Sequence, residues 1–178
     1  IVKAPLFNEG MKENASIFSH TQGWAVIAET LLGNGEQAYN YLRAFMPAAY
    51  NTKAEIRQIE PYVNCQFTHS KYSPRFGASR LPWLTGAATW SYYSATQYIL
   101  GVQPDYDGLR IDPCVPANWK SFKMTRRFRG KFFNIEVKNE KGVQKGVSKL
   151  IVNGEEISGN FIPVEKMKTT NEVIVIMG

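Results

Sequence analysis

The hydrophobic positions of the chain follow two different periods, one before and one after residue 105. In the first part, Trp24, Ile27 and Leu31 recur at the spacing of one helical face, which predicts a helix that starts at Thr21. Gly33 follows at a position where a glycine commonly ends a helix. The pattern therefore predicts a helix between Thr21 and Gly33.

Two more helices are predicted before the period changes. An apolar stripe marks residues 35–45, and Pro47 stops this helix because the residue before a proline avoids helical dihedrals. The short connection from the first helix predicts an antiparallel helical hairpin. The third helix is predicted from Thr85, whose hydroxyl can cap a helix, to Gly101. It is apolar nearly all round, so we expect it to be buried.

Between the second and third helices, residues 47–84 show only weak periodicity, and we expect them to be structured but non-helical. So long a segment of this kind in a compact domain is usually functional. Its mixture of polar, hydrogen-bonding and aromatic side chains suits a carbohydrate or phosphate site better than a core. These side chains are Glu55, Arg57, Glu60, Tyr62, Gln66, His69, Lys71, Tyr72, Arg75 and Arg80.

From about Asp105 the period becomes two, which predicts short strands. Apolar and polar residues alternate over 133–138, and 173–176 is a continuous apolar run. Asn153-Gly154 favours a tight hairpin turn. Six or so such strands predict an antiparallel β-sandwich. The expected fold class is α+β by segments, with helical hairpins followed by an antiparallel β-sandwich.

Composition limits the class of protein. The chain has 178 residues, of which 44% are hydrophobic and 20% charged, with a net charge of +6, so it is not a disordered tail. It contains no apolar run of about 18 residues, which excludes a spanning helix at the sequence level. It begins with Ile-Val-Lys and lacks a signal-peptide pattern, so we expect it to be a fragment of a longer polypeptide.

Cysteine usage predicts a reducing compartment. Cys65 and Cys114 do not form a CxxC pair, so we expect neither a zinc site nor a disulfide framework. Two reduced cysteines are typical of a cytoplasmic protein. The glycosylation sequon at Asn14 is then incidental.

Positive charge is concentrated between residues 120 and 149, where ten basic residues stand against Glu136 and Glu140. Such a stripe can attract phosphate backbones. It can also be the solvated face of strands whose other face is apolar. We favour the solvated face, because the stretch lacks the aromatic and glycine pattern of a nucleic-acid platform, and we expect neither a nucleic-acid nor a membrane partner.

One group of residues could form an anion site. His20 lies just before the first predicted helix, and Thr85-Gly86 opens the third. A helix start offers unpaired N–H groups and the positive end of its dipole, and glycine lets an anion approach the backbone. From the residues alone an ordinary interpretation stays open, in which Thr85 is a helix cap and His20 is structural.

Other polar positions are ambiguous in the same way. Lys12 and Glu13 form a charged cluster, which is more often a solvated turn. Gln66 lies in an apolar and aromatic stretch, where a buried amide must find hydrogen-bond partners. His69 precedes Ser70 but has no acid in a triad-like order nearby, so nucleophilic catalysis by a Ser-His pair is not favoured.

At these residues, long motifs of the chain resemble the inverting glycoside phosphorylases that act on cellobiose and related β-linked disaccharides, the cellobiose phosphorylase family. The motifs are specific and cover nearly the whole chain, the last forty residues being the least distinctive. They are the runs 12–24 (KENASIFSHTQGW), 41–47 (YLRAFMP), 59–67 (IEPYVNCQF), 77–90 (GASRLPWLTGAATW), 108–113 (GLRIDP) and 126–130 (RRFRG).

The resemblance implies a fold. Members of the family are long chains with an N-terminal β-sandwich, a helical linker, an (α/α)6 barrel and a C-terminal jelly-roll domain. Residues 1–104 would then be the C-terminal part of the catalytic barrel, and 105–178 the C-terminal β-sandwich. The rest of the phosphorylase chain would be a partner, and the full protein would be a homodimer.

The resemblance also implies a reaction, the reversible phosphorolysis of cellobiose to α-glucose 1-phosphate and glucose. An ordinary inverting glycosidase uses one carboxylic acid for the leaving group and a second carboxylate to activate water. Phosphate is already anionic and nucleophilic, so groups that hold an anion can replace the second carboxylate. Inorganic phosphate is a co-substrate, and no other cofactor or metal is expected.

Residue roles follow by position in the motifs. The phosphate-binding positions are His20, Thr85 and Gly86, and the substrate-binding positions are Glu13, Gln66 and Lys12. No catalytic residue is assigned, because the family's general acid is an upstream Asp that this chain does not contain, and phosphate-binding arginines also lie upstream. We therefore expect the isolated chain to be inactive.

Two other classes of function stay open. The chain could be a carbohydrate-binding or structural module without chemistry, or an anion- or nucleic-acid-binding domain that uses the basic stripe. Within the enzyme interpretation, cellodextrin, laminaribiose and chitobiose phosphorylases are alternatives, because the choice of acceptor also depends on residues outside the chain.

Overall fold

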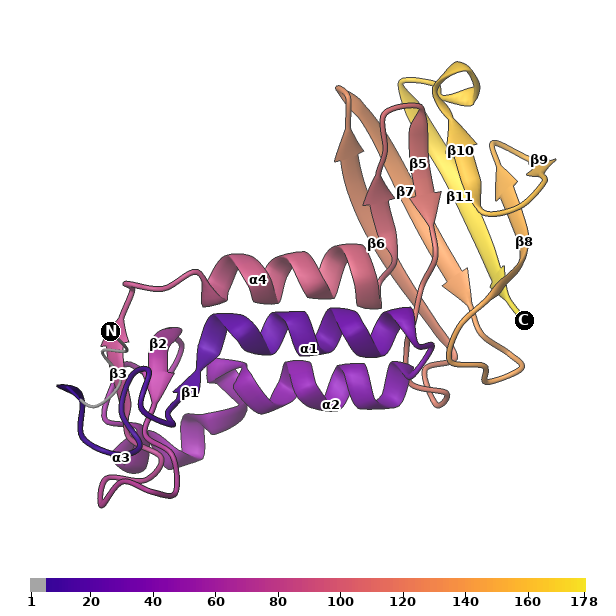
Figure 1. Ribbon diagram of the computed structural model, residues 1–178. Helices are drawn as coiled ribbons and strands as arrows, with labels where there is room; N and C mark the ends of the chain where they lie inside the picture. The colour runs from indigo at the N-terminus through magenta and orange to yellow at the C-terminus, as the bar shows by residue number, and fades with distance from the viewer. Residues whose placement is uncertain (1–5) are drawn as a thin grey trace. The chain divides into compact units, whose positions relative to one another are not determined.

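A computed structural model describes residues 6–178 (Figure 1). These residues form two compact units. The first comprises the described residues up to 26 together with 40–93, and the second comprises 27–39 and 94–178. The limits of these units fall within helices, so the division between a barrel part and a sandwich part at residues 104 and 105 stays a prediction.

The first unit contains helical segments and a small sheet. Its three strands run in the order β1-β2-β3 and are antiparallel, with Phe18 opposite Phe67 and Phe67 opposite Arg80. Parts of α1 and α2 belong to this unit. Its elements are β1 (Ile17–Phe18), α1 (Ser19–Leu31), α2 (Gly35–Phe45), η2 (Pro47–Lys53), α3 (Ala54–Arg57), β2 (Cys65–Thr68), β3 (Ser79–Pro82) and α4 (Ala87–Tyr93).

The second unit contains two sheets, one in the order β10-β5-β4 and one in the order β6-β7-β11-β8-β9. Its elements are η3 (Ser94–Ile99), β4 (Val102–Pro104), β5 (Gly108–Ile111), β6 (Ser121–Phe128), β7 (Lys131–Lys138), β8 (Val147–Val152), β9 (Glu155–Ile157), β10 (Phe161–Pro163), η4 (Val164–Lys166) and β11 (Thr170–Met177). The coarse prediction of helices followed by strands is therefore confirmed.

The helix α2 covers the predicted residues, and Gly33 ends α1 as expected. Gly33 has a positive φ of 83°, its N–H donates to the Thr30 carbonyl, and the Asn34 N–H donates to the Glu29 carbonyl, which together form a Schellman motif. The start of α1 differs from the prediction. The helix begins at Ser19, so His20 lies in its first turn and not ahead of it. The difference is two residues, which is the usual spread in the position of a helix end.

The prediction for residues 47–84 was wrong in part. Pro47 opens the 3₁₀ helix η2, and α3 follows it directly, so 47–57 are helical apart from a kink at Tyr50, whose φ of −118° and ψ of 17° are not helical. A proline suits the first turn of a helix because its fixed φ is already helical and its missing N–H is not needed there. Only the part after Arg57 matches the expected non-helical segment, and it carries β2 and β3.

The third helix also differs from its prediction. It is α-helical only over α4 and continues as the π-helical segment η3. It is not buried all round, since Tyr92 is 64% exposed. Aromatic side chains with a polar tip can lie at a surface, so an apolar-looking helix need not be a buried one.

The large sheet of the second unit has one apolar face. Alternate residues of three adjacent strands are buried, as the period of two predicts; they are Phe133, Ile135 and Val137 on β7, Leu150 and Val152 on β8, and Val173, Val175 and Met177 on β11. Asn153 and Gly154 both have positive φ and connect β8 to β9, so the predicted hairpin turn is confirmed.

The sheet is mixed, not antiparallel as predicted. Strand β11 lies between β7 and β8, antiparallel to β8 but parallel to β7, with Val173 opposite Ile135. A two-residue alternation is the same for both directions, so strand direction depends on the path of the chain between strands.

The basic stretch 120–149 lies mainly on β6, β7 and β8. Exposed side chains alternate along β6 with partly buried ones, and Lys123 of this strand lies 3.5 Å from Glu136 of β7. The charges of this face are therefore partly balanced, as expected for a solvated strand surface. None of the helices within residues 6–178 is long and apolar enough to cross a membrane.

Candidate functional site

The structure brings His20 of α1 next to Gly86, which directly precedes α4. A Cβ atom placed on Gly86 would lie 4.0 Å from the His20 Cβ and 3.6 Å from Cδ1 of Trp90. Gly86 itself is exposed, and His20 is half-buried. The absence of a side chain at Gly86 leaves its backbone open to an anion beside the imidazole.

A second glycine explains why these helices approach each other. A Cβ on Gly23 would lie only 2.9 Å from the Trp90 Cβ, so α4 packs directly on the backbone of α1 at this point. The indole rings of Trp24 and Trp90 pack edge to face, with centroids 5.8 Å apart. The ring of His20 also packs edge to face against Trp24, with ring centroids 5.7 Å apart. The imidazole is thus held by aromatic neighbours.

The turn before α4 is held by its own hydrogen bonds. The hydroxyl oxygen of Thr85 accepts the Ala87 N–H at 3.1 Å, and the Gly86 carbonyl accepts the Trp90 N–H at 3.0 Å. The predicted cap is wrong in position: α4 begins at Ala87 and not at Thr85, so Gly86 is at the N-cap position and Thr85, one residue earlier, holds the turn through its bond from the Ala87 N–H. This bond occupies the Ala87 amide, so an anion at this turn would meet the Thr85 O–H, which can still donate, and the backbone at Gly86.

The chain enters this turn in a strained conformation. Leu81 and Trp83 have positive φ values of 55° and 68°, which is uncommon for residues with a side chain. Trp83 is held by bonds from its N–H to the Asn64 carbonyl and from its indole N–H to Glu60 at 3.4 Å, yet its side chain is 70% exposed. Strained residues of this kind are common at functional sites. Sequence reasoning missed them, because positive φ at a tryptophan has no local signal.

Gln66 lies in β2, next to the start of α1. Its neighbour Phe67 is paired with Phe18 across the sheet, and the thiol of Cys65 lies 3.4 Å from the Ser19 hydroxyl. The Oε1 atom of Gln66 is buried and has no hydrogen-bond partner among the described residues. A buried acceptor without a partner carries a desolvation penalty of about 1–3 kcal/mol. The predicted hydrogen-bond partner of this amide oxygen is therefore missing among residues 6–178, and a donor such as a sugar hydroxyl would suit it.

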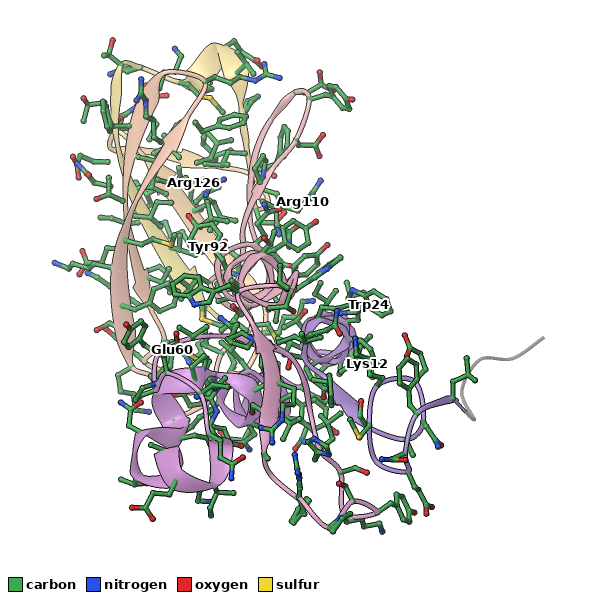
Figure 2. All side chains as sticks on the ribbon, turned by 90° about the vertical axis from the view of Figure 1, so that its left-hand side faces the viewer. Lys12, Trp24, Glu60, Tyr92, Arg110 and Arg126 are labelled. Atoms are coloured by element: carbon green, nitrogen blue, oxygen red, sulfur yellow. The ribbon has the colours of Figure 1, made fainter. Side chains whose placement is uncertain are left out.

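Lys12 and Glu13 lie in the loop that precedes β1, and Figure 2 labels Lys12. The Lys12 ammonium lies 6.0 Å from the centre of the Phe67 ring, and its backbone carbonyl accepts the Ser16 hydroxyl at 2.6 Å. Phe67 directly follows Gln66, so Lys12 is close to the strand that carries the amide. Glu13 is exposed, and its carboxylate is open to a ligand.

A buried histidine, His69, lies beside the loop that precedes β1. The Nδ1 atom of His69 lies 2.8 Å from the Ser73 hydroxyl, and the adjacent Ser70 N–H donates to the Gly10 carbonyl at 3.2 Å. Gly10 comes so close to Ser73 that a Cβ there would lie 2.7 Å from the Ser73 Cβ. Burial lowers the pKa of His69, and the positive charges of Arg80 and Arg75 lower it further. His69 thus anchors the loop through its hydrogen bond with Ser73, in a setting that disfavours protonation of the ring.

Taken together, the first unit contains His20, Thr85 and Gly86 around one turn, and it places Lys12 over the ring of Phe67, the residue that follows Gln66 on β2. An imidazole, a hydroxyl and backbone groups suit an oxyanion, while an amide, an ammonium and a carboxylate suit sugar hydroxyls. Within residues 6–178 no group of three His, Cys, Asp or Glu side chains is arranged to hold a metal ion.

In a comparison with known proteins, two family models match parts of the chain. The model of the glycosyl hydrolase 94 superfamily, catalytic domain, matches residues 1–101. The model of the glycosyl hydrolase family 65, C-terminal domain, matches residues 102–157.

Several characterised relatives are phosphorylases. The chain is 42% identical over 170 residues to N,N'-diacetylchitobiose phosphorylase of Vibrio proteolyticus, a match that covers 96% of this chain and 21% of the relative. It is 30% identical to solabiose phosphorylase of Paenibacillus borealis, over 96% of this chain and 22% of that protein. It is also 30% identical to cellobionic acid phosphorylase of Neurospora crassa, over 94% of this chain and 21% of that protein. The chain thus spans about a fifth of the length of these relatives.

Proposed function

The chain belongs to the glycosyl hydrolase 94 superfamily, and from this we propose that it is the C-terminal part of an inverting glycoside phosphorylase. The proposed reaction is the reversible phosphorolysis of a β-linked disaccharide to an α-sugar 1-phosphate and a free sugar. The observation that carries the proposal is the placement of His20 beside Gly86 and Thr85 in the matched segment. Two regions far apart in the sequence meet there in an arrangement that suits phosphate.

In this mechanism the phosphate takes the place of the activated water of an inverting glycosidase. His20, the Thr85 hydroxyl and the backbone at Gly86 hold the anion on the face of the sugar opposite the leaving oxygen. Attack from that face inverts the anomeric carbon. The contribution of these groups is orientation and charge stabilisation, which can account for a large share of the rate enhancement.

The sugar is held by the groups near β2. The unpartnered Oε1 of Gln66 accepts a hydrogen bond from one hydroxyl, and the exposed carboxylate of Glu13 accepts from another. Lys12 donates to a sugar oxygen from the same loop. The need of the Gln66 oxygen for a donor supports this assignment, because a bound hydroxyl removes its desolvation penalty.

The general acid comes from outside the chain. The first aspartate of the sequence is Asp105, and no aspartate precedes it in the segment that carries the candidate site. Asp105, Asp107 and Asp112 all belong to the second unit. We propose that the remainder of the polypeptide supplies an aspartic acid and further phosphate-binding arginines, so that this chain alone does not turn over a disaccharide. Phosphate is a co-substrate, and the mechanism requires no cofactor.

Two disaccharides are candidates. Cellobiose is the first, from the motifs of the cellobiose phosphorylase family. Diacetylchitobiose is the second, favoured by 42% identity to a chitobiose phosphorylase. Diacetylchitobiose carries 2-acetamido groups where cellobiose carries hydroxyl groups. A 2-acetamido group needs more room than a hydroxyl group, and it needs an additional hydrogen-bond partner.

The wider organisation is part of the same proposal. The helices up to residue 104 would complete an (α/α)6 barrel, and residues 105–178 would form a jelly-roll-like sandwich. The full protein would be a cytoplasmic homodimer that binds neither nucleic acid nor membranes. The match of the catalytic-domain model to residues 1–101 and of a different model to 102–157 supports a division in this region.

The test uses a polypeptide in which this chain is joined to the remainder of the catalytic domain. We expect phosphate-dependent cleavage of cellobiose or diacetylchitobiose, and a rise of about tenfold or more in the KM for phosphate in His20→Ala, as for loss of a hydrogen bond to a charged group. Gln37→Ala, at an exposed position of α2, is the control and should leave the KM unchanged.

An unchanged KM for phosphate in His20→Ala would contradict the phosphate site. Sugar binding by calorimetry without any phosphate-dependent cleavage would instead favour a non-catalytic carbohydrate-binding module. Retention on immobilised DNA above about 0.2 M salt would favour an anion- or nucleic-acid-binding domain, because purely electrostatic contacts weaken steeply with salt.

A further inference from the structure

The first unit contains a cavity of about 360 Å³ between β1, the end of α2, η2, α3 and the β2–β3 sheet. Its walls are largely apolar, with Ile17, Phe45, Ile56 and Phe76 among the lining side chains. This volume is in the range of small-molecule sites. None of the residues proposed above to hold phosphate or sugar lines it.

One wall of the cavity carries a chain of hydroxyl and thiol groups. Ser19 Oγ lies 3.4 Å from Cys65 Sγ, Cys65 Sγ lies 3.6 Å from Thr68 Oγ1, and Thr68 Oγ1 lies 3.0 Å from Ser79 Oγ. Each of these groups can donate one hydrogen bond, so one donor remains after the chain is formed. The cavity therefore offers a hydrogen-bond donor beside an apolar space.

The charges around the cavity are unbalanced. Arg57 lines it and is only 8% exposed. Its guanidinium donates to the Pro61 carbonyl at 3.1 Å and the Val63 carbonyl at 2.9 Å, both neutral, and forms no ion pair with any carboxylate of residues 6–178. Lys53 also lines the cavity, and the described lining contains no Asp or Glu.

A buried cation without a counter-charge is costly, because two carbonyl dipoles replace its hydration shell only in part. Arg57 has five N–H donors and uses two of them in these bonds. An anion in the cavity would supply the missing charge and accept from the remaining donors. The apolar walls require that the rest of such a ligand be hydrophobic.

We propose that this cavity binds a small organic monoanion, a carboxylate carried on an apolar body of about the size of a benzene ring. The carboxylate pairs with Arg57 and Lys53, and the body packs between Phe45 and Phe76. The proposal rests on the cavity and its charges and is independent of the proposed phosphorylase activity.

The experiment is a titration of the 178-residue chain with benzoate, followed by calorimetry or by NMR shifts of the lining residues. We expect saturable binding that is at least about tenfold tighter than binding of benzamide, which has the same body without the charge, because charge-assisted hydrogen bonds are about twice as strong as neutral ones. Acetate, which has the charge without the body, should bind at least as weakly as benzamide.

Two lysine variants separate the cavity from the general attraction of a basic protein for anions. Lys53 lies over the ring of Tyr50 at 5.6 Å, and Lys71 lies over the ring of Tyr72 at 5.3 Å in a similar way, but Lys71 does not line the cavity. Lys53→Met should weaken benzoate binding several-fold, whereas Lys71→Met should not. A fully folded Arg57→Met should lose the preference for benzoate over benzamide.

Equal affinities for benzoate and benzamide, or equal effects of Lys53→Met and Lys71→Met, would overturn the proposal. If Arg57→Met does not fold, the lysine pair and the comparison of benzoate with benzamide still decide the question, since both use chains that keep Arg57.

Discussion

Gly23 and Trp90 pack so closely that a Cβ on the glycine would lie 2.9 Å from the Cβ of the tryptophan. This contact sets the distance between α1 and α4, and it lies about one helical turn from the place where His20 faces Gly86. The candidate phosphate site thus depends on a glycine that takes no part in binding.

The first prediction concerns this contact. Gly23→Ala gains up to about 1 kcal/mol of helix propensity but forces a Cβ against the backbone and Cβ of Trp90, which cannot move aside as a flexible side chain could. We expect a net loss of about 1–2 kcal/mol in the free energy of unfolding, the usual range for an overpacked contact. Urea unfolding measures it, and an unchanged or higher stability would show that the helices separate at no cost.

Gly86→Ala is the matched comparison. The nearest atoms to its Cβ would lie at 3.6 and 4.0 Å, which is ordinary van der Waals contact. We expect stability within about 0.5 kcal/mol of the parent, as for surface substitutions, but weaker binding of phosphate in the longer polypeptide, because the methyl group covers the backbone beside His20. Full retention of the apparent affinity for phosphate would remove Gly86 from the site.

A third prediction concerns the buried amide. Gln66→Met replaces an unpartnered acceptor by an apolar side chain of similar length, so we expect the stability of the chain to stay the same or to rise by about 1 kcal/mol. In the longer polypeptide the same change should raise the KM for the disaccharide with little effect on the KM for phosphate. A marked loss of stability would mean that the amide has a structural partner.

Acid should destabilise the first unit through His69. Because its pKa is lowered by burial, Arg80 and Arg75, the folded chain binds a proton less readily than the unfolded chain does. The contribution of the neutral ring is therefore complete above the ordinary pKa of about 6.5 and is lost as the pH falls towards the folded value. Urea midpoints between pH 8 and 5 should fall with acidification, and less so in a folded His69→Gln. Equal pH profiles for the two chains would refute this role.

Cys114 should be unreactive in the folded chain. Burial raises its pKa to about 11, with Lys145 opposing and Asp112 adding to the shift. At pH 8 almost none of the thiol is ionised, and only the thiolate reacts with iodoacetamide. Peptide mapping after brief labelling should find Cys114 unmodified in the folded chain and modified in guanidinium chloride. Rapid labelling of the folded chain would show that this region opens readily.

Local signals predicted local structure well. The helix α2, the Schellman turn at Gly33 and the hairpin at Asn153-Gly154 each depend on residues within a few positions of one another. The same reasoning failed where a distant partner decides the outcome. Strand β11 is parallel to β7 because of the route of the chain between them.

For the site, the motifs of the chain by themselves determined the family and the identity of the candidate residues, because long runs of specific residues are a property of sequence alone. Only the tertiary structure decided which of these residues meet. The close packing at Gly23 brings His20 to Gly86, and sheet pairing brings Gln66 to the start of α1. The unbalanced charge of Arg57 was equally invisible in the sequence, since whether a cation has a counter-charge depends on what surrounds it in space.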